Sequence, residues 1–421
     1  MTTFRLKGSV PVCVLMLTCL AVGGCQKNHE KWSNASKDRW LELRSGLKLE
    51  MAEQRFNTGD LDQAEAALKE ARGLDPNNPK LLTLAGRIAL ERSQLERAYH
   101  LFELAIEQDV TPEQIEEEGK HLHVHEARYY QGIVFQRWQN YEKAHKRYNE
   151  AYEIEPDNAS YLLASCEMLV ELDRIDEAIV ILEDKKTYFD QNAGIRAALG
   201  HLNSIQGNYD LAADHFKEAS LLDPDNIKMQ EELAMSQFNA GKYEESVYTV
   251  NLITADPTVE VRPDLLRLRA KALFKSNEIE KARQAYLELT RGEHADASDW
   301  IRLGELAWST GDVGGTMTAA NKAITMEPNR HEGYLLAGMV WQKRNRLDDA
   351  LASFDRAAEL APDIAVPLIL RGIALQHADQ SDAAAEAYLE AMRREPSDRR
   401  ARQLLEALAA ANSGPVTAQV Q

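Results

Sequence analysis

The sequence predicts an all-α protein made of about ten repeated pairs of helices. One small residue recurs at steps of 34 residues, with two exceptions of 46 and 36 that indicate insertions of twelve and two. It stands at Ala52, Gly86, Gly132, Cys166, Gly200, Ala234, Ala270, Gly304, Gly338 and Gly372. A second small residue keeps this register from Ala64 to Ala384, and a third position, mostly large and apolar, runs from Leu68 to Tyr388. No single helix pair can bury its apolar face alone, so the repeats are stable only as a stack.

Turn sequences such as Asn57–Asp60 and Gln206–Asn208 separate the two helices of a unit. Prolines close many units, at Pro76, Pro156, Pro224, Pro328, Pro362 and Pro396. Together these positions resemble the tetratricopeptide repeat (TPR) family over roughly residues 45 to 398. The resemblance implies a right-handed superhelical solenoid whose first helices line a concave groove.

The first 24 residues are predicted to be a lipoprotein signal peptide. Arg5 and Lys7 precede a charge-free run, which is short for a membrane span but suits a secretory leader. The residues before Cys25 resemble the bacterial lipobox, which implies cleavage before Cys25 and acylation of its thiol. An ordinary cleaved leader and an uncleaved anchor are the alternatives. By analogy with sorting rules, Gln26 favours the outer membrane, with the protein facing the periplasm.

The remaining segments follow in order. Residues 25–40 are expected to form a lipidated tether, with a helix starting near Trp40, and residues 41–110 to form repeats 1 and 2. An acidic, histidine-rich insertion occupies residues 111–124. If it is helical, His121 and His125 lie one turn apart and could bind zinc; the alternative, a solvated helix without metal, is the one we expect. Repeats 3 to 10 occupy 125–397, a capping helix 398–411, and a disordered tail 412–421.

Charge and cysteine content exclude some classes of function. The net charge is −18, and it becomes −20 without the leader, because 47 basic residues then face 67 acidic ones. A nucleic-acid partner is therefore not expected. Cys166 is the only thiol left after processing, so no intrachain disulfide forms in the mature chain. Its small-residue position predicts buried packing rather than a reactive thiol.

No catalytic signature was found. The three His-Glu pairs lack the second histidine of a zinc protease helix, and the chain has no phosphate loop, nucleophile elbow or Cys-x-x-Cys motif. The glycine-rich segment Gly311–Thr316 falls on a turn and a helix start, which favours a weak repeat or hinge over an anion site. We therefore expect no enzymatic activity, no cofactor and no small-molecule substrate.

The repeat register places a set of side chains on the groove. These are Tyr129, Tyr130, Ile133, Met235, Phe238, Arg267, Lys271, Phe274, Ile301, Arg302, Trp308, Leu335, Met339, Ile369 and Ile373. The alternative for each apolar member is packing between repeats. The carboxylate clamp of chaperone-binding TPR domains is not matched. The basic stretch of Arg267, Lys271 and Arg302 predicts a partner peptide or amphipathic helix that carries an acidic group.

These features predict a non-catalytic scaffold or adaptor, lipid-anchored in the bacterial cell envelope and bound to protein partners. The architecture is similar to TPR lipoproteins that serve pilus assembly, secretin targeting and exopolysaccharide export. The alternative is an accessory factor that docks an envelope enzyme, such as a murein hydrolase, a protease or a glycan synthase. Analogy of fold does not choose between them.

Overall fold

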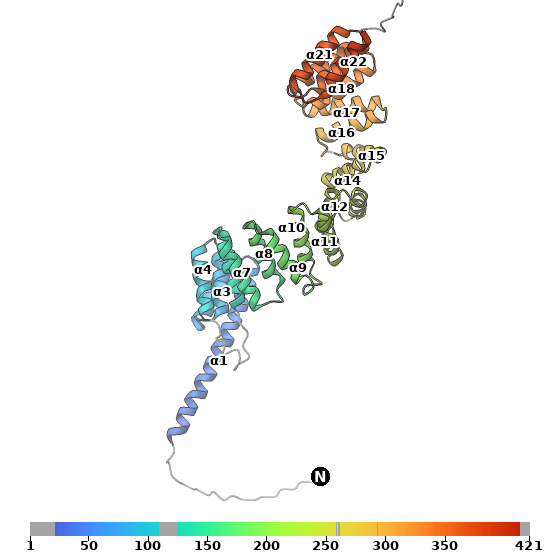
Figure 1. Cartoon of the computed structure of the whole chain (residues 1–421). Coiled ribbons are helices and arrows are strands. Elements are labelled where there is room, and N and C mark those ends of the chain that lie inside the picture. Colours follow the sequence, from blue (N-terminus) through green and yellow to red (C-terminus); the bar gives the residue numbers. More distant parts are fainter. Residues whose placement is uncertain (1–21, 109–123, 258, 260–261, 293, 413–421) are drawn as a thin grey trace, which may run out of the picture. The chain divides into compact units, whose positions relative to one another are not determined.

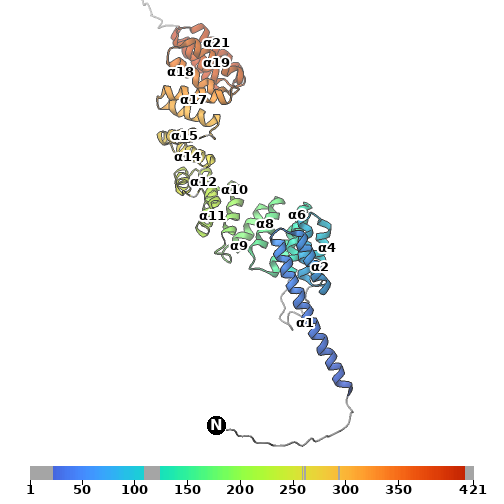
Figure 2. The same cartoon turned by 180° about the vertical axis from the view of Figure 1, so that it is seen from behind.

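The computed structural model describes residues 22–108, 124–257, 259, 262–292 and 294–412 (Figure 1). Throughout these residues, the regular structure is helical, and no strand occurs (Figure 2). The chain divides into two compact units, Met1–Leu182 and Glu183–Gln421. The predicted all-α fold class is confirmed.

Successive helices pack as pairs, two helices to a repeat. In the first unit the helices are α1 (Val22–Asn57), α2 (Leu61–Leu74), α3 (Pro79–Glu91), α4 (Leu95–Glu107), α6 (Val124–Arg137), α7 (Tyr141–Ile154) and α8 (Ala159–Glu171). Helix α9 (Ile175–Lys185) runs across the boundary of the units. In the second unit they are α10 (Ala193–Ile205), α11 (Tyr209–Leu222), α12 (Ile227–Asn239), α13 (Tyr243–Ala255), α14 (Pro263–Lys275), α15 (Ile279–Arg291), α16 (Ala297–Ser309), α17 (Val313–Met326), α18 (His331–Lys343), α19 (Leu347–Leu360), α20 (Val366–His377), α21 (Ser381–Arg394) and α22 (Arg399–Asn412).

Each turn within a helix pair contains one residue with positive φ. These residues are Gly59, Ser93, Gln139, Asp173, Gly207, Gly241, Asn277, Gly311, Asn345 and Asp379. They repeat with the same steps as the small residues of the sequence, 34 residues except for one of 46 and one of 36. The left-handed conformation ends one helix and redirects the chain into the next. The ten turns therefore define ten repeats.

Asparagine and aspartate side chains cap many helix starts. The side chain of Asn78 accepts the N–H of Lys80 before α3, and Asn158 accepts that of Ser160 before α8. Asp312 does the same for Gly315 at the start of α17. Such caps satisfy backbone donors that have no partner inside the helix, which fixes where each helix begins.

The small residue of the first helix packs against the large residue of the second helix in the same repeat. A Cβ placed on Gly338 would lie 2.5 Å from the Phe354 ring, and one on Gly372 would lie 2.4 Å from the Tyr388 ring. Gly86, Gly132 and Gly200 face Phe102, Tyr148 and Phe216 in the same way. The large residue also reaches the next repeat, since Tyr148 shares a buried cluster with Met168 of α8 and Tyr388 shares one with Leu408 of α22.

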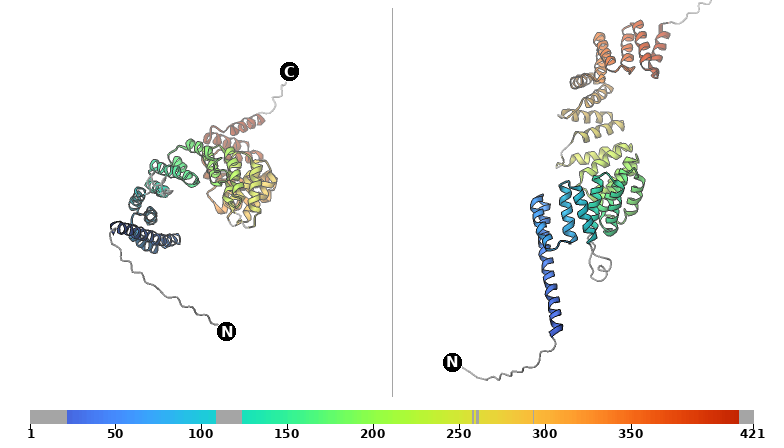
Figure 3. Two further views of the ribbon diagram at one scale, coloured as in Figure 1. Left: turned by 90° about the horizontal axis from the view of Figure 1, so that it is seen from below. Right: turned by 90° about the vertical axis from the view of Figure 1, so that its left-hand side faces the viewer.

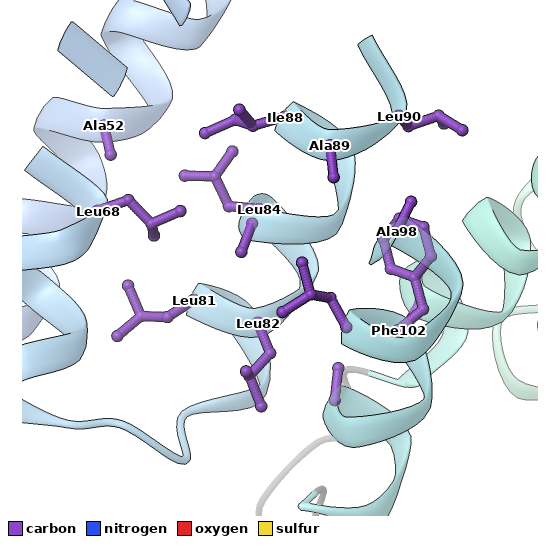
Figure 4. Packing of buried hydrophobic residues seen from close by; sticks show 14 of the residues in the cluster. Ala52, Leu68, Leu81, Leu82, Leu84, Ile88, Ala89, Leu90, Ala98 and Phe102 are labelled. Carbon is purple, nitrogen blue, oxygen red and sulfur yellow. The ribbon is translucent and has the colours of Figure 1, made fainter. Parts of the chain in front are cut away.

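The core of the first unit shows how adjoining repeats share one apolar interior (Figure 4). Leu81, Leu84 and Ile88 of α3 lie on the side that faces α1 and α2, where Ala52 and Leu68 meet them. Phe102 of α4 packs on the other side of α3 and is fully buried. Each helix thus contributes to two interfaces, which is why stability is shared between neighbours.

Helix α1 is longer than the sequence indicated. A helix was expected from about Trp40, but α1 begins at Val22 and its N-terminal part extends beyond α2 (Figure 3). The tether segment is therefore helical. The physical reason is composition, because residues 25–45 contain no glycine or proline and several good helix formers. At the other end α22 packs on α21 through buried Ala401 and Leu408.

Candidate functional site

In each unit, the positions of the first helices that the repeat register assigned to the groove are here called the groove face. These first helices are α1, α3, α6 and α8 in the first unit, and α10, α12, α14, α16, α18 and α20 in the second. The structure places Met235, Lys271, Phe274 and Arg302 in exposed positions. It places Tyr129, Tyr130, Ile133, Phe238, Arg267, Trp308, Leu335, Met339 and Ile373 half-buried. Ile301 and Ile369 are 4% and 5% exposed, so they supply core packing and offer little surface to a partner.

The predicted tyrosines of the first unit belong to an aromatic cluster between repeats. The ring of Tyr129 lies 4.9 Å from that of Tyr161 on α8 and 5.2 Å from that of Tyr148 on α7. Tyr130 stacks on Phe102, with 5.6 Å between the ring centroids. Packing with neighbouring rings therefore occupies part of each tyrosine, and both side chains are half-buried.

Arg87 and Glu53 are groove residues that the sequence analysis missed. The Arg87 guanidinium carbon lies 4.6 Å from the Phe56 ring and 5.1 Å from the Tyr130 ring, and its Nε is buried without a hydrogen-bond partner. Arg87, Glu53 and His125 line a cavity of about 190 Å³ over α1, α3 and α6. The repeat register could have identified both residues, because Glu53 and Arg87 each directly follow the small residue of their repeat.

Several apolar side chains on the groove face of the second unit keep part of their surface exposed. Phe274 on α14 is 40% exposed and Met235 on α12 is 45% exposed. Leu335 and Met339 on α18 border the buried cluster around Phe354 and keep part of their surface open. By the repeat register, Met235, Phe274, Trp308, Leu335 and Met339 fall on the same face of successive first helices and are here called the apolar strip. Such a face suits the apolar side of a peptide.

The predicted basic stretch in this unit is largely neutralised. Arg267 forms two hydrogen bonds to the Asp299 carboxylate, of 2.7 and 2.6 Å, and lies 3.4 Å from Asp296. Arg302 forms an ion pair of 2.7 Å with Glu305. Lys271 is exposed. The acidic partner stays a prediction, and two of the three cations on which it depends already have carboxylate partners.

The remaining candidate sites have structural explanations or lie outside the described residues. Cys166 is 3% exposed, and burial raises the pKa of its thiol to about 12, so the thiol is protonated at neutral pH. Within Gly311–Thr316 the Asp312 carboxylate accepts the Gly315 N–H at 2.8 Å, which places an anion where a bound anion would sit.

The two histidines predicted as weak metal ligands cannot be compared directly. His125 lies 3.0 Å from the Tyr161 hydroxyl, whereas His121 lies outside the described residues. The described part of the chain holds no cluster of three metal-ligating side chains.

Comparison with known families and structures identifies the repeats. Models described as tetratricopeptide repeat match residues 56–115 and residues 193–226. A comparison with curated proteins gave no match.

Similar solved structures are TPR proteins. One, from Parabacteroides merdae, shares 19% identity over 63% of this chain and 99% of its own, with a TM-score of 0.39. The C-terminal part of a TPR repeat-containing protein from Cytophaga hutchinsonii shares 15% over 55% of this chain and 94% of its own, with a TM-score of 0.46. YrrB, described as a TPR protein with an unusual peptide-binding site, shares 13% over 53% of this chain and 97% of its own, with a TM-score of 0.33. At these identities the likeness concerns the fold alone.

The family matches cover two separate parts of the chain, and the ten helix pairs repeat in one register through both units. Repeats of this kind build extended surfaces for protein–protein interaction. Two parts of the chain therefore match tetratricopeptide repeat models, and the described residues of both units are built from helix pairs in that repeat register.

Proposed function

We propose that this protein is a lipid-anchored, non-catalytic scaffold of the bacterial cell envelope that holds partner peptides or helices on its groove face. The observation that carries the proposal is the apolar strip of the second unit. Phe274, Trp308, Leu335 and Met339 come from three first helices, α14, α16 and α18, and the repeat core leaves part of each side chain uncovered. Such a strip suits an amphipathic helix or an extended peptide.

The partner is selected by apolar shape rather than by charge. Arg267 and Arg302 already have carboxylate partners, so a negative group on the ligand gains little from them. Leu335 and Met339 lie beside each other on α18 and would form the centre of the contact, where binding energy concentrates.

The anchor is proposed from the sequence around Cys25. A charge-free leader, a lipobox-like run and the cysteine itself support acylation at this residue. Among the described helices, none is both long and apolar enough to span a bilayer. Several acyl chains on Cys25 give stable attachment where a single chain is marginal. The outer membrane, with the repeats in the periplasm, is the proposed location.

The groove-face proposal is tested by site-specific photocrosslinking in native membranes. A photoreactive residue at Phe274 or at Leu335 should capture the same protein. A matched control is Tyr248, which is 65% exposed on α13, a second helix. Equal capture of that protein from position 248 would contradict the assignment.

The identity of the captured protein separates the two functional alternatives. A pilus, secretin or polysaccharide-export subunit supports the assembly scaffold. A murein hydrolase, protease or glycan synthase supports the docking factor instead. With the purified partner, Leu335→Ala should mainly speed dissociation, because it removes contact area without changing long-range charge. Unchanged dissociation would exclude Leu335 from the interface.

A further inference from the structure

Helix α1 carries an apolar face that the repeats do not cover. Trp40, Leu43, Leu47 and Met51 are 55%, 71%, 63% and 48% exposed. They follow one another at steps of three or four residues, so they lie on one side of the helix and are here called the α1 stripe. Four large apolar side chains in a row are unlike the scattered apolar residues normal for a soluble surface.

The opposite side of α1 is the one that packs on the repeats. Ser45 and Ala52 are buried, and the Ser45 hydroxyl donates to the Ala71 carbonyl of α2 at 3.5 Å. With about 3.6 residues per turn, these positions lie roughly half a turn from the α1 stripe. The stripe therefore points away from α2, and it is not needed to hold α1 in place.

Basic residues follow one edge of the stripe. Lys37, Arg44 and Arg55 are exposed and share that edge by helical register. The guanidinium carbon of Arg44 lies 5.1 Å from the Trp40 ring. The other edge is mixed, with Arg39 and Glu50. An aromatic and aliphatic face bordered by cations is the pattern of helices that lie in a membrane interface.

We propose that the α1 stripe lies in the headgroup region of an anionic membrane. Trp40, Leu43, Leu47 and Met51 enter the interface, and the basic edge contacts lipid phosphates. A second copy of the chain fits less well, because a stable dimer buries about 800 Å² and 20–30 residues on each partner. Four side chains of one helix fall well short of that, whereas binding to lipid needs no minimum footprint and grows with the apolar area inserted.

Membrane contact of the α1 stripe also sets the orientation of α1 relative to the bilayer, a step that rests on the proposed acylation of Cys25. Fifteen helical residues between Cys25 and Trp40 span about 22 Å at 1.5 Å per residue. The acyl chains and the stripe reach the same bilayer only if α1 lies along the surface. The first repeat is then held against the membrane instead of standing off on a stalk.

A fluorescent reporter on the stripe tests the proposal independently of the anchor. The chain from residue 25 onward carries Cys25→Ser, so no acyl chain attaches it, and Leu47→Cys takes an environment-sensitive thiol dye, because Cys166 is buried. Vesicles of phosphatidylglycerol and phosphatidylethanolamine should raise the dye emission several-fold and shift it to the blue. The same dye on Leu221→Cys, at a position 74% exposed on α11, should not respond.

Two variants refine the test. Leu43→Asp with Met51→Asp should abolish the response of the dye at position 47. Lys37→Glu with Arg44→Glu should weaken vesicle binding at least several-fold and remove its salt dependence. No response at saturating lipid overturns the proposal. A response that depends on protein concentration and not on lipid also overturns it, because a second copy then covers the stripe. Failed acylation of Cys25 in cells would refute the anchor and the direction of α1, but leaves this vesicle result intact.

Discussion

The Arg267 guanidinium forms a bidentate ion pair with the Asp299 carboxylate of the next repeat. Its Nε and Nη2 lie 2.7 and 2.6 Å from the two carboxylate oxygens, and the Asp299 side chain is only 2% exposed. Asp299 also accepts the Asp296 N–H at 3.0 Å in the capping box that begins α16. One ion pair therefore joins α14 to the start of α16. Arg267 thus stabilises the contact between two repeats, and its charge is already matched by a carboxylate of the chain.

Removing Arg267 should destabilise the second unit. Arg267→Ala leaves the Asp299 carboxylate buried without its cation, and we expect a loss of about 2–3 kcal/mol in the free energy of unfolding. The control is Arg302→Ala, whose partner Glu305 is exposed, with an expected loss of about 0–1 kcal/mol. Urea titrations followed by circular dichroism compare them. Equal losses would show that the buried pair is no stronger than a surface pair.

Alanine at two glycines should have opposite effects. In Gly338→Ala the new Cβ lies 2.5 Å from the Phe354 ring, and the resulting strain should lower stability by about 1–3 kcal/mol. Gly73, in α2, has nothing within 4 Å of the same added atom. Gly73→Ala should therefore be neutral or stabilise by up to about 1 kcal/mol through helix propensity. Thermal melts give the sign of each change, and a loss at both positions would contradict the packing argument.

The sequence was informative where a contact repeats within one helix pair. Gly338 and Phe354 are separated by the spacing that recurs in most repeats, so their register could be recognised without coordinates. Non-glycine turn residues such as Asn277 and Asp379 escaped notice, because a left-handed conformation has no unique residue type. The fold could be predicted because the same small and large positions recur in most repeats.

Contacts between repeats were much harder to predict. The pairing of Arg267 with Asp299 depends on how α14 and α16 are placed side by side, which the spacing alone does not give. Arg87 was missed for a different reason: its place in the register was visible, but its position between the rings of Phe56 and Tyr130 was not. The register also did not predict how much of each groove side chain is exposed, because Ile369 was expected on the groove and is buried.

Acid should weaken the second unit through His215. This histidine is 6% exposed, and burial lowers the pKa of its imidazole below the usual value near 6.5, although Glu183 lies 3.1 Å from its Nε2. Below about pH 6.5 the unfolded chain binds a proton that the folded chain resists. Stability is therefore full above that pH and falls as the pH drops towards the folded-state pKa.

The check is a comparison of urea midpoints at about pH 7 and about pH 5.5 for the wild-type chain and His215→Gln. The variant lacks the titrating imidazole, so its midpoint should fall less between the two pH values. The difference in slope is at most about 1.4 kcal/mol per pH unit for one proton. An identical pH dependence in both chains would rule out His215 as the responsible group.

Loss of the Cys25 thiol should release the protein from the membrane. Cys25→Ser leaves no sulfur to accept a lipid at the proposed processing site, so the protein should lose its label in cells fed a clickable fatty acid and should leave the membrane fraction when salt weakens residual surface contacts. The control is Cys166→Ala, which removes the buried thiol that burial keeps protonated and should remain labelled. Equal label in the Cys25→Ser variant and in the wild-type chain would refute acylation at this residue. Cys166 is the one other cysteine of the mature chain, and the Cys166→Ala control shows whether it carries any of the label.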